Sequence, residues 1–423
     1  MRVLIVNTSE RIGGAAVASY RLMEALKDNG VKAKMLVRDK QTEQITVAAL
    51  PKSWRLKFNF VWERFVIWTH NRFSKRNLFA VDIANAGTDI TSLQEFKEAD
   101  VIHLAWINQG MLSLGSIKKI IDSGKPIVWT MHDQWPCTAI CHNADGCDNY
   151  ESGCHHCPYL RGGGSSHDLS YHVFEKKFAI YRDADITFIA CSHWLENIAK
   201  NSKLAEGHEV LSIPNPINTT IFCKISKPSA RERLHIPTDK KYILFGSVKI
   251  SDKRKGVDYL IKACNALANE HPDLAGNIEV LVFGNRAEEL EGQLPFHVRA
   301  LGYISEERKQ AIIYNAADLF VTPSLQENLP NMIMESMSCG TPCVGFNVGG
   351  IPEMIDHEVN GYVAKYKSTE DLAKGMYWTL FEADRDNLSK QCLAKVSASY
   401  SERAVASQYI NIYHKITNTN YYG

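Results

Sequence analysis

The sequence has no long apolar run, because no stretch approaches the roughly 18 uncharged apolar residues that a membrane-spanning helix needs. It also has no excess of charge of one sign, since 48 lysine and arginine residues stand against 47 aspartate and glutamate residues. That balance argues against nucleic-acid binding driven by a basic surplus. With 45% apolar residues, the 423-residue chain is far from disordered compositions and suits two domains of about 200 residues each.

A secretory leader is not evident. Residues 3–6 form an apolar run about half as long as a leader requires, and no small-residue cleavage site follows, so we expect the first strand there. Of the eleven cysteines, five fall within residues 137–157 and six are scattered, which is unlike the disulfide framework of a small secreted domain. We therefore expect a cytoplasmic protein.

The first half alternates short β-branched runs with amphipathic segments. We expect strands over residues 2–7, 31–37, 100–104, 127–131 and 185–191, and helices over 15–29, 117–123 and 194–201. After a proline- and asparagine-rich stretch the rhythm restarts, with strands over 242–246, 278–284, 319–322 and 342–346 and helices over 257–270 and 401–416. This βαβα order is typical of parallel, doubly wound sheets.

We therefore predict an α/β fold of two Rossmann-like domains that face a central cleft. The N-terminal domain is expected over residues 1–217 and the C-terminal domain over 218–400, with the helical segment 401–423 packing back on the first domain. Ligands of such sheets bind at the carboxyl ends of the strands.

Residues 323–350, PSLQENLPNMIMESMSCGTPCVGFNVGG, carry the strongest signal of a site. Pro330 suits the first turn of a helix, which places Glu327 just before that helix and Glu335 one to two turns inside it. Backbone N–H groups at a helix start are available to ligand oxygens. The glycine pair that ends the stretch allows the backbone to approach a ligand closely.

Residues 314–318 (YNAAD) and 323–355 resemble the C-terminal signature of family 4 glycosyltransferases, which adopt the GT-B fold. The resemblance extends to the loop Gly13-Gly14-Ala15-Ala16, the strand end Thr130-Met131-His132-Asp133, the helix start at 192–194 and the pair Lys255-Gly256. It implies a nucleotide-diphosphate sugar donor, transfer with retained anomeric configuration, and no catalytic metal.

The resemblance also implies roles for single residues. Glu327 would face the donor sugar and diphosphate, and Glu335 would hydrogen-bond the ribose hydroxyls. Amides around Asn328, Leu329 and Asn331 would contact sugar hydroxyls. A carboxylate suits this task because it offers two strong acceptors to a neutral polyol.

A departing diphosphate needs positive charge, and residues 245–256 hold four basic residues directly after a strand. Family members usually carry arginine after the strand glycine, where this chain has Ser247. Lys255 keeps its place before the next glycine. Either Arg254 or Lys249 could replace the missing arginine, and the sequence does not choose between them.

Two candidates lie in the first domain. Gly13 and Gly14 separate the first strand from the first helix, where glycines permit close approach of a diphosphate or sugar and the helix start favours anions. They lack the G-x-G-x-x-G spacing of a dinucleotide site. His132 follows a strand at its carboxyl end, and its family counterpart contacts the donor sugar. His103 is a weaker candidate of the same kind.

A cysteine-rich insert is expected over residues 137–160. Four cysteines lie within 17 residues, at Cys141, Cys147, Cys154 and Cys157. Their four thiolates are enough to enclose one tetrahedral structural zinc ion. A subset of the resembling family carries a similar insert. Two disulfides and unliganded thiols remain alternatives. Cys137 is then surplus, and a ligand could also come from the histidines at 142, 155 or 156.

Residues 51–80 interleave aromatic and basic residues, with seven Lys/Arg and one Glu between residues 52 and 76. Trp54, Phe58, Val61, Phe65 and Trp68 fall on one helical stripe. The pattern suits an interfacial helix on anionic lipid, at the inner face of the cytoplasmic membrane, or a helix packed on its own domain. We do not expect nucleic-acid binding here.

Together these features predict a retaining glycosyltransferase that uses a nucleotide-diphosphate sugar and a glycan or lipid-linked saccharide acceptor, in bacterial capsule, lipopolysaccharide or exopolysaccharide synthesis. The alternatives are a nucleotide-sugar epimerase on the GT-B fold and a non-catalytic, zinc-stabilised glycan- or membrane-binding protein. The presence of both Glu327 and Glu335 favours the transferase.

Overall fold

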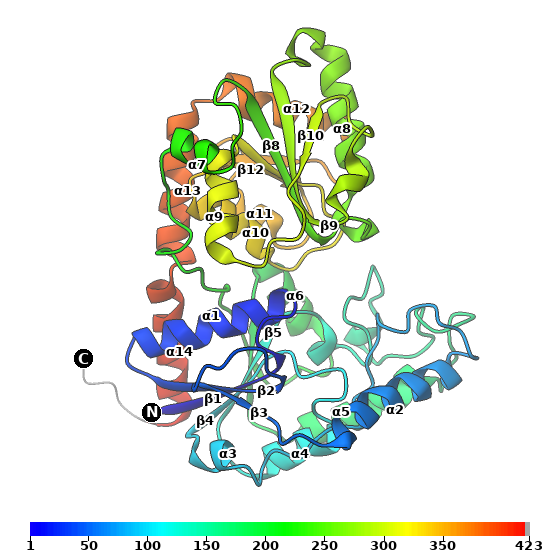
Figure 1. The fold of residues 1–423 in the computed structure, drawn as a ribbon. Helices are drawn as coiled ribbons and strands as arrows, with labels where there is room; N and C mark the ends of the chain where they lie inside the picture. Colours follow the sequence, from blue (N-terminus) through cyan, green and yellow to red (C-terminus); the bar gives the residue numbers. More distant parts are fainter. Residues whose placement is uncertain (419–423) are drawn as a thin grey trace. The chain divides into compact units, whose positions relative to one another are not determined.

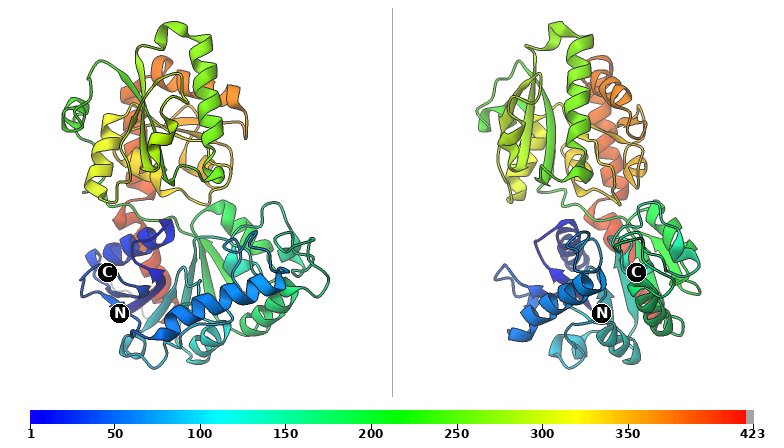
Figure 2. Two further views of the ribbon diagram at one scale, coloured as in Figure 1. Left: turned by 45° about the vertical axis from the view of Figure 1, so that its right-hand side comes forward. Right: turned by 90° about the vertical axis from the view of Figure 1, so that its right-hand side faces the viewer.

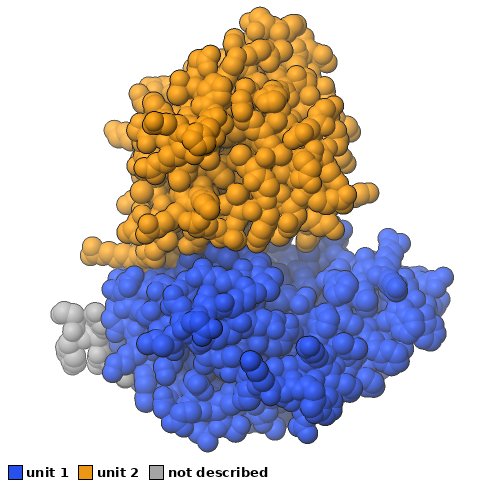
Figure 3. Space-filling view, viewed as in Figure 1, with its two compact units in different colours: residues 1–215, 405–423 blue, residues 216–404 orange. Residues whose placement is uncertain are grey.

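The computed structural model describes residues 1–418 and divides the chain into two compact units (Figures 1 and 3). Unit 1 contains residues 1–215 together with the chain from residue 405 onward, and unit 2 contains residues 216–404. The division therefore lies two residues before the domain boundary predicted at 217/218. Of the predicted C-terminal segment 401–423, residues 419–423 lie outside the described part of the chain.

Unit 1 is built on a parallel sheet in the order β3-β2-β1-β4-β5-β6-β7. Its strands are β1 (Arg2–Ser9), β2 (Lys32–Asp39), β3 (Val47–Ala49), β4 (Val101–Leu104), β5 (Ile127–Met131), β6 (Ile186–Ala190) and β7 (Glu209–Ser212). Its helices are α1 (Gly14–Asp28), α2 (Trp54–His70), α3 (Gln94–Glu98), α4 (Leu114–Asp122), α5 (Leu169–Tyr181), α6 (His193–Asn201) and α14 (Glu402–Ile416). The chain moves outward from β1 in both directions, so β1 and β4 flank the point where the winding reverses.

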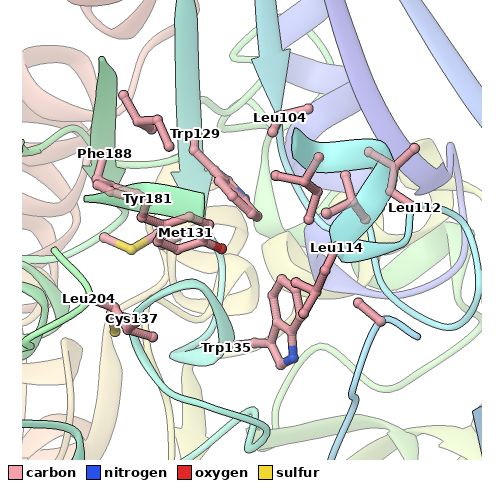
Figure 4. Packing of buried hydrophobic residues seen from close by; sticks show 14 of the residues in the cluster. Leu104, Leu112, Leu114, Trp129, Met131, Trp135, Cys137, Tyr181, Phe188 and Leu204 are labelled. Carbon is pink, nitrogen blue, oxygen red and sulfur yellow. The ribbon is translucent and has the colours of Figure 1, made fainter. Parts of the chain in front are cut away.

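The side chains of these strands alternate between two apolar layers. Val3 and Ile5 of β1 point to the layer that α1 and α14 cover. Leu4 and Val6 point to the opposite layer, which α4, α5 and α6 cover. In that second layer the ring of Trp129 lies against Tyr181 and Phe188, with centroids 5.8 and 6.0 Å away (Figure 4).

Unit 2 is built on a second parallel sheet in the order β10-β9-β8-β11-β12-β13. Its strands are β8 (Lys241–Lys249), β9 (Ile278–Asn285), β10 (His297–Ala300), β11 (Leu319–Thr322), β12 (Cys343–Phe346) and β13 (Gly361–Ala364). Its helices are α7 (Lys227–Arg233), α8 (Val257–Glu270), α9 (Glu307–Ala316), α10 (Asn331–Ser338), α11 (Ile351–Met354), α12 (Thr369–Tyr377) and α13 (Arg385–Ser399). One apolar layer packs α8 and α12 against the strands. The winding reverses between β8 and β11.

The predicted fold class, two parallel doubly wound α/β domains, is confirmed. Every strand predicted from the sequence is present. The four strands that were not predicted are β3, β7, β10 and β13, which form the outer edges of the two sheets. Each has one neighbouring strand and is less completely buried than four-residue central strands such as β4 and β11, so its sequence carries a weaker apolar pattern.

Helix α14 is bound into unit 1 by buried hydrogen bonds as well as by apolar contact. The hydroxyl oxygen of Tyr413 lies 2.6 Å from Nδ1 of His103, and Nε2 of that ring lies 2.7 Å from Oγ1 of Thr130. Thr130 in turn lies 2.9 Å from the hydroxyl of Tyr409. Burial lowers the pKa of His103 to about 3, so the ring is neutral. His103 therefore has a structural role, and its candidacy as a ligand contact is wrong.

Replacing Tyr413 with alanine should lower the free energy of unfolding of unit 1 by about 3–5 kcal/mol, because a fully buried ring is lost. Tyr413→Phe keeps the ring but leaves His103 without one partner, and should cost about 1–3 kcal/mol. Urea unfolding followed by tryptophan fluorescence measures this, since seven of the eight tryptophans lie in unit 1. Tyr303→Ala, at an exposed site in unit 2, is the control; equal losses in all three variants would contradict this role of α14.

Candidate functional site

The principal candidate site in unit 2 lies at the carboxyl ends of β8 and β11, where the winding of the sheet reverses. Open α/β sheets bind ligands at such points because the loops diverge there and leave the strand ends accessible. Lys255 follows β8 and Glu327 follows β11. Nζ of Lys255 lies 2.5 Å from Oε1 of Glu327, and their side chains are 32% and 13% exposed. The structure thus brings together two predicted site residues 72 positions apart.

Two glycines allow the backbone to pack around Glu327. A Cβ atom on Gly256 would lie 1.8 Å from the carbonyl oxygen of Pro323, and one on Gly349 would lie 1.7 Å from the carbonyl oxygen of Glu327. Both glycines also have positive φ angles, 70° and 57°. Any larger residue would push the loops apart, so these contacts fix the position of Glu327.

The start of α10 completes this part of the site. The helix begins at Asn331 with Pro330 as its N-cap, one residue later than predicted. Asn328 and Asn331 are half-buried and Leu329 is buried. The N–H of Gly350 donates to the carbonyl of Asn328 at 2.9 Å, which joins the loop after β12 to the loop after β11.

Glu335 lies inside α10 and is buried. The hydroxyl of Tyr314, on α9, donates to Oε2 of Glu335 at 2.9 Å. Burial, and next the negative charge of Glu335, hold the pKa of Tyr314 well above its usual value, so the hydroxyl remains a donor. Tyr314 therefore fixes the orientation of the second predicted carboxylate, a role that the sequence did not indicate.

The side chains of the basic loop after β8 differ in their exposure and in their partners. Ser247, which stands where an arginine was expected, is buried and donates to the carbonyl of Lys249 at 3.0 Å. Nη2 of Arg254 lies 2.7 Å from Oδ2 of Asp252, and the Arg254 side chain is exposed. Lys249 is also exposed. Of the three cations considered, Lys255 is the one in contact with Glu327.

In unit 1, the predicted glycines lie between β1 and α1. Gly13 is the N-cap of α1 with φ of 91°, and α1 begins at Gly14. No atom would lie within 4 Å of a Cβ on Gly13, so the backbone angle, and not a close neighbour, favours glycine here.

His132 lies directly after β5 and is held on both ring nitrogens. Nε2 lies 3.2 Å from Oγ of Ser19, on α1, and Nδ1 lies 3.5 Å from Sγ of Cys191. Burial lowers the pKa of His132 to about 4, although the neighbouring Asp133 opposes that shift. The ring is therefore neutral at physiological pH and interacts through hydrogen bonds.

Asp133 joins a network that the sequence did not reveal. Its Oδ2 lies 2.8 Å from Nδ1 of His142 and accepts the indole N–H of Trp106 at 2.7 Å. Burial opposes a charged ring, but Asp133 raises the pKa of His142 above its usual value. The sequence feature that could have indicated this network is the position of Asp133 and Trp106, which follow the carboxyl ends of the neighbouring strands β5 and β4. His142, considered as a metal ligand, is committed to this carboxylate.

The four cysteines predicted to bind zinc line one cavity of about 20 Å³. All eleven thiols of the chain are free. As the side chains stand, no three of the described His, Cys, Asp or Glu residues are placed to hold a metal ion together. Cys137 is buried outside the cavity, and its Sγ donates to the carbonyl of Gln134 at 3.2 Å.

Helix α2 runs along the outside of unit 1 (Figure 2), and the exposure of its side chains shows that the aromatic stripe faces solvent. Four residues of the predicted stripe, Trp54, Phe58, Val61 and Phe65, are 48% to 71% exposed, whereas the fifth, Trp68, is half-buried. We define the exposed stripe as these four residues together with Trp62, which is 43% exposed. Successive rings contact each other, with centroids 5.7 to 6.0 Å apart. The alternative prediction, a helix packed on its own domain, is met by the other side of α2, where Ile67 is buried in the core of unit 1 and Leu56 and Val66 lie against it.

The opposite side of α2 is anchored by buried ionisable side chains. Nη2 of Arg64 lies 3.0 Å from Glu63 and 3.1 Å from Asp82. Oε1 of Glu63 accepts the N–H groups of Ile83 and Ala84 at 3.0 and 2.7 Å. These contacts bury the one acidic side chain of residues 52–76, while six basic side chains stay exposed. Within residues 1–418, no helix has the length and apolar character needed to cross a bilayer.

Two family models match the chain. The model described as "Glycosyltransferase Family 4" matches residues 12–221, and that described as "Glycosyl transferases group 1" matches residues 239–381. The chain is similar to the putative colanic acid biosynthesis glycosyl transferase WcaC of Escherichia coli K12, with 24% identity over 75% of each chain. It is also similar to an uncharacterized glycosyltransferase of Methanocaldococcus jannaschii, with 29% identity over 44% of this chain; that match spans about half of the relative (48%).

Solved structures share the fold. Anabaena HepE in complex with UDP-glucose superposes with a TM-score of 0.64 and 16% identity, covering 98% of this chain and all of that one. At this identity the likeness establishes the architecture alone. The two parallel-sheet domains thus have the GT-B arrangement of elements.

Because His132 is neutral when folded and titrates near 6.5 when unfolded, the unfolded chain binds more protons between pH 6.5 and 4. The free energy of unfolding should therefore fall as pH drops through this window, by about 1.4 kcal/mol per pH unit for each such histidine. In His132→Gln, the slope of the free energy of unfolding against pH should decrease at pH 5 by about 1.4 kcal/mol per pH unit, because unfolding takes up one proton fewer. Urea unfolding at several pH values measures this slope. A slope in His132→Gln equal to that of the wild type would contradict a neutral ring.

Proposed function

Because this chain belongs to the family 4 and group 1 glycosyltransferases, we propose that it transfers a sugar from a nucleoside-diphosphate sugar to a hydroxyl of a glycan or lipid-linked acceptor with retained anomeric configuration. The observation that carries the proposal is the contact between Lys255 and Glu327 at the switch point of unit 2. The likeness to WcaC supports an acceptor in bacterial surface polysaccharide synthesis. The HepE complex with UDP-glucose supports a nucleotide-sugar donor.

Lys255 and Glu327 supply complementary interactions for such a donor. The ammonium of Lys255 can neutralise charge that develops on the departing diphosphate. The carboxylate of Glu327 can accept hydrogen bonds from sugar hydroxyls, and its contact with Lys255 keeps both groups at one place. The half-buried setting strengthens these interactions because water screens them less.

Glu335 is proposed to bind the ribose hydroxyls of the donor. Tyr314 holds one carboxylate oxygen of Glu335, so the group has a defined orientation inside α10. A preoriented acceptor loses little conformational entropy when a ligand binds. His132 and the Gly13-Gly14 turn are proposed to contact the donor from unit 1, where the neutral ring favours hydroxyl groups over anions.

For the transfer itself we propose displacement on one face of the sugar. The acceptor oxygen bonds to the anomeric carbon as the bond from that carbon to the diphosphate oxygen breaks. The acceptor proton passes to the departing phosphate oxygen, so no protein nucleophile is required. Because the acceptor enters on the face that the diphosphate leaves, the configuration is retained.

Replacing Lys255 with alanine should lower kcat for sugar transfer by about two orders of magnitude or more, as the loss of a preorganised charge contact typically does. Release of nucleoside diphosphate from a panel of nucleotide sugars, with glycan acceptors present, measures the rate. Lys253→Ala removes an exposed lysine from the same turn and should retain the wild-type rate.

The same assay separates the alternatives. Wild-type rates in both Lys255→Ala and Glu327→Ala would show that this site does not catalyse the reaction. An unchanged rate in Lys255→Ala, with a large loss in Arg254→Ala or Lys249→Ala, would show that another cation stabilises the diphosphate.

We further propose that α2 contacts an anionic lipid surface, where a lipid-linked acceptor would reside. The support is the combination of an exposed aromatic stripe with six exposed basic side chains and a buried acid in residues 52–76. Aromatic rings enter the headgroup boundary of a bilayer, and each basic residue near an anionic surface adds about 1 kcal/mol. The contact would be peripheral, on the cytoplasmic face of the membrane.

Vesicles that contain phosphatidylglycerol should sediment the protein, and binding should weaken as salt is raised. A triple variant that combines Trp54→Ser, Phe58→Ser and Trp62→Ser should no longer sediment with the vesicles. The matched control replaces the exposed Ile45 and Tyr303, which lie outside the stripe, with serine. Equal recovery in the supernatant with and without vesicles would contradict the proposed contact.

A further inference from the structure

The segment between β5 and α5 is long and has little regular backbone structure. Within residues 138–168, all of which the structure describes, the helical structure is one turn, η2 (Asn149–Glu151), and one isolated bridge pairs Cys141 with Val81. Even so, Ile140, Ala144 and Tyr150 are buried in the core of unit 1. Most of its internal backbone hydrogen bonds close single turns, and the segment is longer than loops in compact domains usually are, so a further source of order is expected.

Four thiols converge within this segment. Cys141, Cys147, Cys154 and Cys157 all line the cavity of about 20 Å³. A glycine with positive φ precedes two of them, Gly146 at 83° and Gly153 at 141°, which turns the chain back toward the cavity. A space of this size accommodates about one water-sized occupant.

The lining of the cavity limits what could occupy it. Among the described residues, its lining contains no carboxylate, and most of its surface is apolar. Hard cations such as calcium and magnesium need oxygen ligands and are therefore unsuited. Four thiols in a mostly apolar lining, which also includes His155, match the sulfur-rich tetrahedral coordination of structural zinc.

A buried lysine supplies a second, independent observation. Lys177 of α5 is fully buried, and its ammonium donates to the carbonyls of Trp135 and Thr138 at 2.7 and 2.9 Å. It also lies 3.2 Å from the centre of the Trp135 ring. Burial lowers the pKa of Lys177 to about 7, and the negative charge of Asp82, which opposes that shift, is itself paired with Arg64. An isolated buried cation is costly, so a nearby negative group is expected.

We propose that Cys141, Cys147, Cys154 and Cys157 bind one structural zinc ion as four thiolates, and that Lys177 is its buried counter-charge. Zinc with four thiolates carries two net negative charges, which the ammonium partly offsets. Binding displaces the four thiol protons and requires the side chains to rotate onto the ion, because they do not yet share a ligand geometry.

The ion would also position His142. This residue follows Cys141 directly, and its N–H donates to the carbonyl of Ala80 at 3.2 Å while its ring contacts Asp133. Asp133 in turn follows His132. A metal that fixes Cys141 therefore limits the movement of the network next to the proposed donor contact of unit 1. His142 is a positioning residue in this arrangement.

Elemental analysis of the full chain, purified in reducing buffer without added metal, tests the proposal independently of transfer activity. We expect one zinc per chain. Cys147→Ser and Cys154→Ser should each lose most of the zinc, whereas Cys137→Ser should keep it because that thiol lies outside the cavity. Cobalt substituted for zinc should show the charge-transfer absorption of thiolate ligands in wild type and in Cys137→Ser.

A second variant keeps the test informative if the cysteine variants fail to fold. Lys177→Met preserves the length of the side chain and removes its charge, so zinc should pass to a competing chelator about ten times faster. Zinc below about a tenth of an equivalent in wild type would overturn the proposal, whether mass spectrometry shows free thiols or disulfides. Full zinc content in both Cys147→Ser and Cys154→Ser would overturn it as well.

Discussion

Glu327 is held between two backbone contacts that only glycine permits, one at Gly256 and one at Gly349. The first brings the turn with Lys255 against the end of β11, and the second brings the loop after β12 against Glu327 itself. Without these contacts, three loops that leave adjacent strands would diverge, and the cation and carboxylate would separate. The chemistry proposed for unit 2 therefore depends on backbone packing as much as on charged side chains.

Unit 1 uses buried polar contacts for the same purpose. His132 is oriented by a serine on α1 and a cysteine after β6, and Asp133 by an indole and a second imidazole. Each partner comes from a different loop or helix, so the end of β5 is fixed by the fold around it. Satisfied networks of this kind are rigid because each group would pay a large desolvation cost if it lost its partner.

Much of the fold could be predicted from the sequence, and the reason is burial. Central strands such as residues 127–131 are covered on both faces and read as continuous apolar runs, whereas the edge strands β3, β7, β10 and β13 are short and lack that pattern. Glu327, Lys255 and Glu335 could be named because they lie in a recognisable motif. Tyr314, the pairing of Asp133 with His142, and the burial of Lys177 depend on contacts between distant segments, which periodicity and spacing do not encode.

The discontinuous composition of unit 1 has a consequence for how the protein is made. A ribosome completes residues 216–404 before it adds the residues of α14 that fill one apolar layer of unit 1. Unit 2 can therefore reach its final core while unit 1 still exposes the side of its sheet that Tyr409 and Tyr413 will cover. Unit 1 is thus synthesised first but completes its core last, and it has to avoid aggregation during that interval.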